Sequence, residues 1–248
     1  MNGNAPRQET GERLDRALFA RGIARSRSAA ADLIQRGKVR VNGAVTTKAS
    51  KEVMPSDVVQ ADQDVSYVSR AGEKLAHALR EFGIDPAGLT AIDIGSSTGG
   101  FADCLLQKGA ARVIAVDVGT GQLAQSLRDD PRVEAHESTD IRSFEPASPA
   151  DLAVIDVSFI SLEHILPKAF ELLKKGGRTV ALVKPQFEVG KEAADRAKGV
   201  ITDPAEQAHA LEAVKKIAQK AGFKVAAETA SPIEGEKGNK EFLLYLTR

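Results

Sequence analysis

A run of small residues follows a short apolar segment near the middle of the sequence. The apolar segment spans residues 91–94 and includes Asp93, the small residues after it are Gly95, Ser96, Ser97, Thr98, Gly99 and Gly100, and Phe101 then begins a predicted helix. In a strand, a glycine-rich turn and a helix, the backbone approaches a ligand closely, because side chains are missing from the turn. These residues therefore predict a binding site, with a mere packing role for the glycines as the alternative.

An acidic residue, Asp117, lies within the next apolar segment, residues 113–118. In an open parallel sheet, an acid at this place lies at the carboxyl edge beside the glycine-rich turn and accepts hydrogen bonds from a ribose. The sequence therefore predicts a ligand that contains adenosine. The fingerprint G-x-G-x-x-G is absent, because three residues separate Gly95 from Gly99, and a cofactor without phosphates is favoured.

The segments around this turn alternate between strands and helices. Strands are predicted at residues 91–95, 113–118, around 133, 151–156 and 178–184, and helices at 69–82, 101–109, 164–175 and 204–221. This alternation is typical of an α/β fold with a doubly wound parallel sheet. Two consecutive strands, 223–227 and 241–246, predict an antiparallel hairpin at the end.

The first sixty residues carry an excess of positive charge. Residues 12–51 contain ten Lys and Arg against three acids, although the whole chain has 34 of each sign. Two helical patterns and short strands predict a small α+β unit at residues 11–60, then a linker at 61–68 and a second domain at 69–248. The predicted RNA-binding residues form a basic face suited to phosphates, with a solvated surface as the alternative: Arg13, Arg16, Arg25, Arg27, Arg36, Lys38 and Arg40.

Composition excludes several classes of protein. One cysteine, Cys104, allows no internal disulfide and fits a reducing compartment, so we expect a cytoplasmic protein. No apolar stretch approaches the ~20 residues of a membrane span. The four histidines lack the spacing of metal ligands. We therefore expect neither a membrane partner nor a metal.

Two parts of the sequence resemble known families. Residues 37–43, GKVRVNG, together with Leu14-Asp15 and Ser26-Arg27, resemble the S4 RNA-binding domain. Residues 92–101 resemble the loop of FtsJ-type RNA 2′-O-methyltransferases, which have a class I, Rossmann-like sheet. An S4 unit joined to such a domain resembles the TlyA or hemolysin A family of rRNA methyltransferases over residues 12–248. The resemblance implies S-adenosyl-L-methionine as the cofactor and ribosomal RNA or ribosomal subunits as partners.

The methyl acceptor predicted from the residues is a ribose hydroxyl. C5 methylation of a base usually needs a cysteine, and a packing role is expected for Cys104. Amino-group methylation usually shows Asp/Asn-Pro-Pro-aromatic, and residues 156–159 read Asp-Val-Ser-Phe instead. The FtsJ-type Lys-Asp-Lys-Glu tetrad has a matching residue at each place, namely Lys74, Asp156, Lys184 and Glu241. The resemblance implies that Lys184 activates the hydroxyl, as a base or as an electrostatic stabiliser, and a surface salt bridge is the alternative for each residue alone.

The resemblance also implies how the cofactor lies. Residues 95–101 would surround its methionine, Asp117 its ribose, and Asp140 and Ile141 its adenine. Residues 186–199 are expected to close over RNA or to form a solvated loop. A cytolysin, which no membrane-inserting stretch supports, and a non-catalytic RNA-binding module are the alternative functions, and a nicotinamide dehydrogenase fits least. The rRNA and nucleotide stay open.

Overall fold

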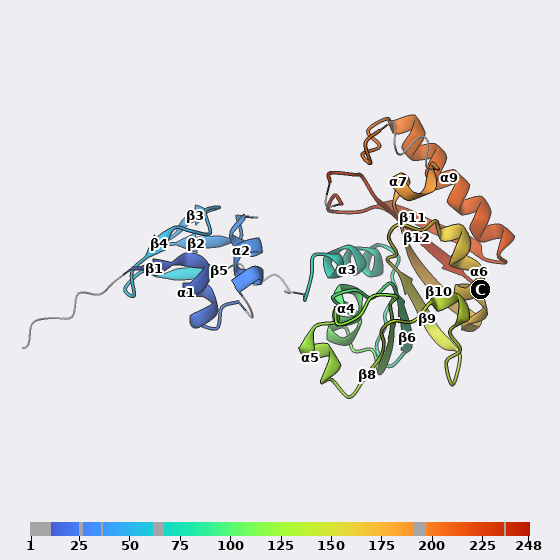
Figure 1. Ribbon diagram of the computed structural model, residues 1–248, viewed down its shortest axis with the longest axis horizontal. Helices are drawn as coiled ribbons and strands as arrows, with labels where there is room; N and C mark the ends of the chain where they lie inside the picture. The colour runs from blue at the N-terminus through green and yellow to red at the C-terminus, as the bar shows by residue number, and fades with distance from the viewer. Residues whose placement is uncertain (1–10, 25–26, 36, 62–66, 191–196, 236) are drawn as a thin grey trace, which may run out of the picture. The chain divides into compact units, whose positions relative to one another are not determined.

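The computed structural model describes residues 11–24, 27–35, 37–61, 67–190, 197–235 and 237–248. The chain forms two compact units, Met1–Ser66 and Tyr67–Arg248, which are described separately (Figure 1). Residues 62–66 of the predicted linker lie outside the described residues. Ala61 ends a strand of the first unit, whereas Tyr67 is buried in the core of the second. We propose that the domain boundary lies between Ala61 and Tyr67, within the predicted linker.

The N-terminal unit combines two helices with short antiparallel strands. Its elements are β1 (Glu12–Arg13), α1 (Leu14–Ala20), α2 (Arg27–Gln35), β2 (Val39–Val41), β3 (Ala44–Thr46), β4 (Glu52–Val53) and β5 (Val59–Ala61). Strand β2 lies between β3 and β5, and β1 pairs with β4. In β2 the valines are buried and Arg40 is exposed, so apolar residues of the strand share one core with both helices. The first of the two predicted helices begins at Leu14, because the two residues before it pair with β4.

A seven-stranded sheet forms the centre of the C-terminal unit. Its order is β11-β12-β10-β9-β6-β7-β8, with β12 antiparallel to both of its neighbours and the strands from β10 to β8 parallel. The strands are β6 (Thr90–Ile94), β7 (Arg112–Val116), β8 (Val133–His136), β9 (Ala150–Ile155), β10 (Leu173–Val183), β11 (Lys224–Ala230) and β12 (Phe242–Thr247). The order confirms the predicted fold class, including the final hairpin. The order reverses between β6 and β9, and in such sheets ligands bind beyond the carboxyl ends at this point.

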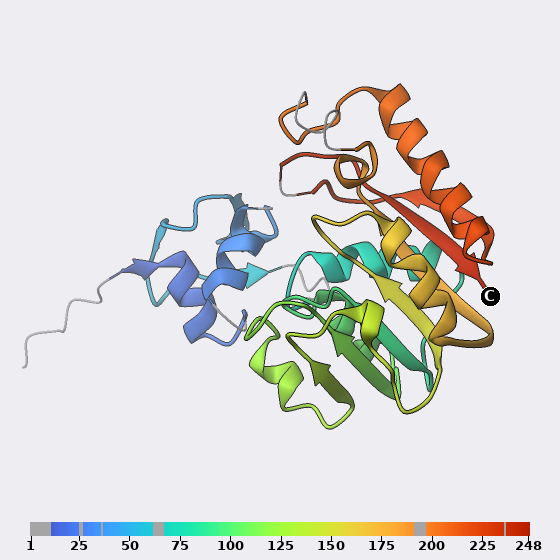
Figure 2. The ribbon, with the colours of Figure 1, turned by 45° about the vertical axis from the view of Figure 1, so that its right-hand side comes forward.

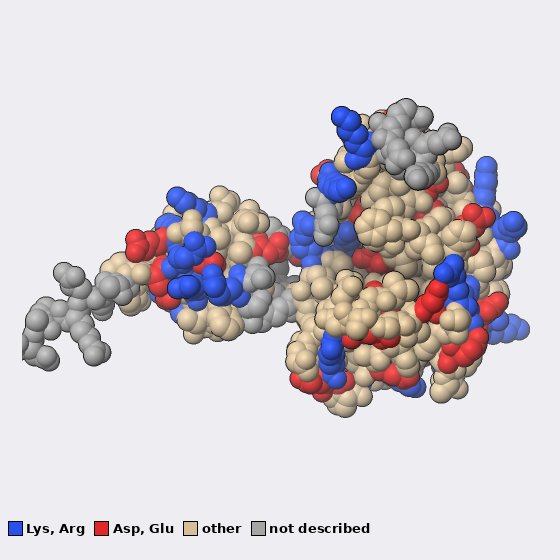
Figure 3. All heavy atoms as spheres, viewed as in Figure 1, with Lys and Arg blue, Asp and Glu red and all other residues tan. Residues whose placement is uncertain are grey.

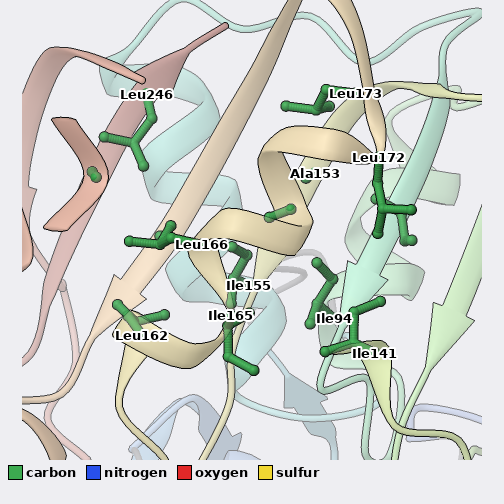
Figure 4. Close-up of a cluster of buried hydrophobic side chains, with 14 of the residues drawn as sticks. Ile94, Ile141, Ala153, Ile155, Leu162, Ile165, Leu166, Leu172, Leu173 and Leu246 are labelled. Carbon is green, nitrogen blue, oxygen red and sulfur yellow. The ribbon is translucent and has the colours of Figure 1, made fainter. Parts of the chain in front are cut away.

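Helices cover both faces of this sheet. On one face lie α3 (Ala71–Glu81), α4 (Gly100–Gln107) and α5 (Gln125–Arg128), and on the other α6 (Leu166–Glu171) and α9 (Pro204–Lys220) (Figure 2). Buried residues of the strands alternate between the two cores, so Leu152 faces the first layer, whereas Ala153 and Ile155 face the second (Figure 4). The fold thus has three layers with two apolar cores.

One predicted helix is shorter than the sequence pattern indicates. The helix expected at residues 164–175 is split between a 3-10 turn, η2 (Leu162–His164), and α6, and β10 already begins at Leu173. The register of β10 against β9 shifts between Leu173 and Arg178, which absorbs the two glycines at 176–177 inside the strand. None of the helices among the described residues is long and apolar enough to cross a membrane.

Candidate active site

A cavity of about 1490 Å³ opens at the carboxyl edge of the central strands of the C-terminal unit. It is lined by residues that follow β6, β7, β9 and β10, by the start of α3 and by the segment before β12. Thirteen of the fifteen predicted catalytic and cofactor residues line it, namely Lys74, Gly95, Ser96, Ser97, Thr98, Gly100, Phe101, Asp117, Asp140, Ile141, Asp156, Lys184 and Glu241. Asp93 and Gly99 do not.

Gly95 lies where the ends of β6 and β9 come closest. Its φ is +82°, a conformation that side chains disfavour, and a Cβ there would lie 2.6 Å from the carbonyl oxygen of Asp156. The amide of Asp156 donates in turn to the carbonyl of Ile94 over 3.0 Å. The glycine therefore lets the turn approach Asp156, the tetrad residue that follows β9.

Two further glycines of the turn are required by packing. At Gly99, whose φ is +94°, a Cβ would collide with the side chain of Leu127 from α5, and at Gly100 it would collide with Ser69 before α3. The packing role that the sequence left as an alternative therefore applies to Gly99 and Gly100. Gly95 and Gly100 also line the cavity, and binding of a ligand by the turn stays a prediction.

Asp117 follows β7 and binds the turn directly. The amide of Ser97 donates to its Oδ2 over 2.8 Å, and the amide of Gly119 donates to its Oδ1 over 2.7 Å. These two bonds fix the carboxylate at the cavity wall. A carboxylate oxygen accepts more than one hydrogen bond, so capacity remains for the hydroxyl groups of a ribose.

Asp93 lies behind the turn. Its side chain is completely buried, Oδ2 accepts from the amide of Ala102 over 2.9 Å, and Oδ1 has no partner. Burial, together with the nearby carboxylate of Asp156, raises the pKa of Asp93 well above its usual value. The side chain therefore holds the start of α4 and supports the turn from behind.

Asp140 and Ile141 form the start of a 3-10 helix, η1 (Ile141–Ser143). Asp140 caps it by accepting from the amide of Arg142 over 2.9 Å, and the guanidinium of the same residue lowers the pKa of Asp140 to about 2. Ile141 belongs to the apolar core and is 6% exposed. Both line the cavity, and their contact with an adenine stays a prediction.

Lys184 and Asp156 form one ion pair that lines the cavity. Nζ of Lys184 lies 2.6 Å from Oδ1 of Asp156, and it donates to Oγ of Ser158 over 2.8 Å. Strands β9 and β10 are parallel neighbours, so the residues after their ends meet at one edge. Pro185, at the start of α7 (Pro185–Glu188), has no amide to continue the strand.

Lys74 and Glu241 form the second ion pair. They lie 167 positions apart, and their side chains are only 10% and 3% exposed. Phe242 pairs with Val183, so Glu241 enters the cavity beside the end of β10. Four charged side chains thus line one cavity as two pairs. Their low exposure distinguishes them from surface salt bridges.

The family comparison agrees with this geometry. The model of the FtsJ-like methyltransferases matches residues 67–248, and the model of the S4 domain matches residues 12–59. The chain belongs to the FtsJ-like methyltransferase family. An S4 domain followed by an FtsJ-like domain is the arrangement that the sequence analysis described. The predictions of an enzyme and of S-adenosyl-L-methionine as its cofactor are confirmed.

Curated relatives match almost the whole of this FtsJ-like methyltransferase. The 16S/23S rRNA (cytidine-2′-O)-methyltransferase TlyA of Mycobacterium tuberculosis is 44% identical over 94% of this chain and 89% of its own length. The 23S rRNA (cytidine-2′-O)-methyltransferase TlyA of Campylobacter jejuni is 36% identical over 89% and 93%. Hemolysin A of Brachyspira hyodysenteriae is 43% identical over 94% and 98%. The predicted TlyA or hemolysin A family is therefore confirmed.

Solved structures share the fold. A candidate hemolysin from Streptococcus thermophilus superposes with a TM-score of 0.74 and 39% identity, over 97% of this chain and 89% of that one. The N-methyltransferase NodS of Bradyrhizobium japonicum, in complex with S-adenosyl-L-homocysteine, has a TM-score of 0.51 at 18% identity, over 72% and 85%. This second likeness shows the fold alone.

The sequence of this FtsJ-like methyltransferase did not lead us to predict a pair of aromatic side chains at the cavity. The rings of Phe159 and Phe187 lie 5.2 Å apart, and Nζ of Lys184 lies 5.9 Å from the centre of the second ring. Phe159 is 91% exposed and has a φ of +63°, which is unusual for a side chain of its size. Its place three residues after Asp156 was the available sign, because loops that follow parallel strands form the site.

Glu188 joins α7, which carries Phe187, to the loop after β9, which carries Phe159. Its Oε2 accepts from Oγ of Ser161 over 2.7 Å, and its Oε1 accepts from the amide of Leu162 over 3.1 Å. Burial raises the pKa of the Glu188 carboxyl. The residue therefore fixes α7 against the loop that follows β9.

The remaining predicted residues have mixed outcomes. Residues 191–196 of the predicted RNA loop lie outside the described residues, and Lys198, which is described, is exposed and lines the cavity. In the S4 unit Arg13 and Arg27 both bind Asp15, Arg16 and Arg40 are exposed, and Lys38 is half-buried. Arg25 and Arg36 lie outside the described residues. Basic side chains gather on the visible face of that unit (Figure 3).

Cys104, the cysteine of the sequence, does not line the cavity. Cys104 is buried in the core beside α3, and burial raises the pKa of its thiol to about 12. In the part of the chain that the structure describes, no three His, Cys, Asp or Glu residues gather as a metal site. Cys104 therefore has the packing role that the sequence favours.

Proposed function

We propose that this FtsJ-like methyltransferase transfers a methyl group to the 2′-hydroxyl of a cytidine in ribosomal RNA, in the cytoplasm. The observation that carries the proposal is the joint presence of two ion pairs, one buried and one partly buried, and the glycine-rich turn in one cavity. Two curated relatives, at 44% and 36% identity, are named as enzymes of this specificity. The basic S4 unit supplies a surface for structured RNA.

The cavity fits S-adenosyl-L-methionine on its own features. The turn presents backbone rather than side chains, and Asp117 is held at the wall with acceptor capacity for a ribose. When bound, this cofactor supplies an electrophilic methyl group on its sulfonium. We infer that residues 95–101 and Asp117 hold it, with Asp140 and Ile141 beside its adenine.

We infer the role of the tetrad from its ion pairs and from the hydrogen bond of Lys184 to Ser158. A lysine ammonium has three donors, and two oxygens, from Asp156 and Ser158, lie within 2.8 Å of Nζ of Lys184. A third N–H remains for the ribose oxygen. We infer that Lys184 acts as a fixed cation that stabilises the negative charge developing on this oxygen. Lys74 and Glu241 would hold the ribose in line with the methyl group.

The experiment uses tritiated S-adenosyl-L-methionine and purified 30S and 50S subunits from a strain that lacks the gene. Lys184→Met should lower transfer at least 100-fold, in the range that single catalytic groups contribute. The matched control is Lys174→Met, because Lys174 forms a 2.6 Å ion pair with Asp151 and does not line the cavity. Equal transfer by the two variants, or no transfer by the wild type to either subunit, would contradict the proposal.

The cytolysin alternative has a direct test. One relative bears the name Hemolysin A, and the described residues contain no helix that spans a membrane. Dye-loaded liposomes of neutral and anionic lipid should stay intact in the presence of the purified chain. Leakage that Lys184→Met does not change would establish a second activity.

A further inference from the structure

Asn239 joins two loops at the wall of the cavity. Its Nδ2 donates to the carbonyl of Gly199 over 2.8 Å, and its Oδ1 accepts from the amide of Ile201 over 2.8 Å. The side chain is 2% exposed and reaches across 40 positions of sequence. Both halves of the amide group therefore hold the segment 197–201 against the turn that precedes Glu241.

Each of the two loops is also fixed on its own side. Nε2 of Gln207, on α9, donates to the carbonyl of Ile201 over 2.7 Å. The amide of Gly235 donates to the carbonyl of Asn239 over 2.9 Å. A Cβ on Gly235 would lie 2.6 Å from Oε1 of Glu241, so this turn packs directly on the tetrad. The loops thus form a wall that continues the active site.

This wall carries two exposed lysines. Lys198 and Lys237 both line the cavity, together with the exposed acid Glu234. Nζ of Lys237 lies 3.9 Å from the position that a Cβ of Gly199 would occupy, so the joined loops place the lysines at one rim. Lys and Arg side chains gather at this edge of the C-terminal unit (Figure 3). A pair of cations at the mouth of a site suits the phosphates of a nucleic acid.

We propose that Asn239 is a positioning residue that holds Lys198 and Lys237 where they contact the RNA phosphates beside the target ribose. The inference rests on the proposed function, because it requires an RNA strand in the cavity. The tetrad and the cofactor-binding residues act on the methyl transfer. Asn239 and the two lysines instead act on the binding of the RNA backbone. It therefore affects the KM for RNA and its dependence on salt.

The test measures kcat and the KM for ribosomal subunits at several salt concentrations. The double variant Lys198→Ala/Lys237→Ala should lower the slope of log KM against log salt by about 1.4, at about 0.7 for each lost contact to a single strand. Asn239→Ala should reproduce at least half of this decrease, with kcat and the Kd for S-adenosyl-L-methionine within about twofold of wild type. Adding Asn239→Ala to the double variant should change KM by less than about twofold, since residues of one network are not additive. Lys240→Ala, an exposed neighbour outside the cavity lining, is the control and should keep the wild-type slope.

Three results would overturn the proposal. The first is a double variant with the same slope as Lys240→Ala, which would remove the phosphate contacts. The second is an Asn239→Ala chain that loses kcat at a wild-type slope, because that outcome indicates a merely structural role. If Asn239→Ala does not fold, Asn239→Asp takes its place, because it keeps the acceptor for Ile201 and turns an oxygen toward the carbonyl of Gly199. A wild-type slope in Asn239→Asp is the third result that would overturn the proposal. If the wild type transfers no methyl to RNA, the proposed function itself fails.

Discussion

Gly95→Ala should damage both the fold and the chemistry of the C-terminal unit. A Cβ at this position meets the backbone carbonyl of Asp156, the residue after β9, at 2.6 Å, and a backbone carbonyl cannot swing away as the end of a flexible side chain does. The φ of +82° adds a second cost. Any shift that relieves the contact moves Asp156, and with it the 2.6 Å ion pair to Lys184.

The expected size follows from these two terms. A left-handed conformation costs a residue with a side chain about 1–2 kcal/mol, and overpacking costs about 1–3 kcal/mol. Gly88→Ala is the matched control, because Gly88 has a φ of +73° and nothing within 4 Å of a Cβ. It should lose the first term alone. At about 2–4 °C per kcal/mol for a unit of this size, Gly95→Ala should melt about 2–12 °C below Gly88→Ala.

Circular dichroism on heating gives the two melting temperatures, and transfer of tritiated methyl to subunits gives the two activities below both transitions. Gly88→Ala should transfer methyl groups like the wild type, whereas Gly95→Ala should lose at least tenfold, since small displacements of catalytic groups are costly. Equal melting temperatures together with equal transfer would refute the claim that Gly95 permits a close approach to Asp156.

Three other substitutions or reagents test separate parts of the structure. Because the pKa of Asp93 is raised in the folded state, the folded chain holds an extra proton between about pH 4 and that raised pKa. Within this window its free energy of unfolding should fall by about 1.4 kcal/mol per pH unit relative to Asp93→Asn, as measured by urea unfolding. Iodoacetamide at pH 8 should modify Cys104 far more slowly in the folded chain than in urea, because the thiol is buried and its pKa is raised to about 12, and mass spectrometry measures this. Phe159→Ala should leave the melting temperature unchanged, because the ring is 91% exposed, and should raise the KM for RNA about 5–150-fold, the equivalent of about 1–3 kcal/mol for one stacked base.

Each of these expectations has a contrary result. A pH dependence of stability shared by the wild type and Asp93→Asn would show that Asp93 is ionised in the folded chain. Alkylation of Cys104 at equal rates with and without urea would place the thiol at the surface. A wild-type KM for RNA in Phe159→Ala would show that this ring does not stack on a base.

The sequence predicted which residues meet, because parallel strands bring their ends to one edge. Asp117, Asp156 and Lys184 each follow an apolar strand, and the structure places all three on one cavity. The fold class followed from the alternation of strands and helices. The glycine-rich turn was recognised, and its glycines are also needed for packing, because a Cβ on Gly99 or Gly100 would collide with a neighbouring side chain.

The pairing of the side chains could not be predicted from the sequence. Lys74 binds Glu241 across 167 positions, and the register of β12 against β10 that brings them together depends on contacts between distant segments. Asn239 was missed for the same reason, since its partners follow a different strand. The helix expected at residues 164–175 ended early because pairing of Leu173 with Ala150 overrides local helical preference.

The central claim, methylation of a ribose hydroxyl beside Lys184, is tested most directly by the resistance of the product to alkali. Ribosomal RNA labelled by the wild type with tritiated S-adenosyl-L-methionine is hydrolysed in alkali and the fragments are separated by charge. A 2′-O-methyl group blocks the attack of its own oxygen on the phosphate, so the label should appear in dinucleotides and should be absent after reaction with Lys184→Met. Label in mononucleotides would show methylation of a base and would contradict the account.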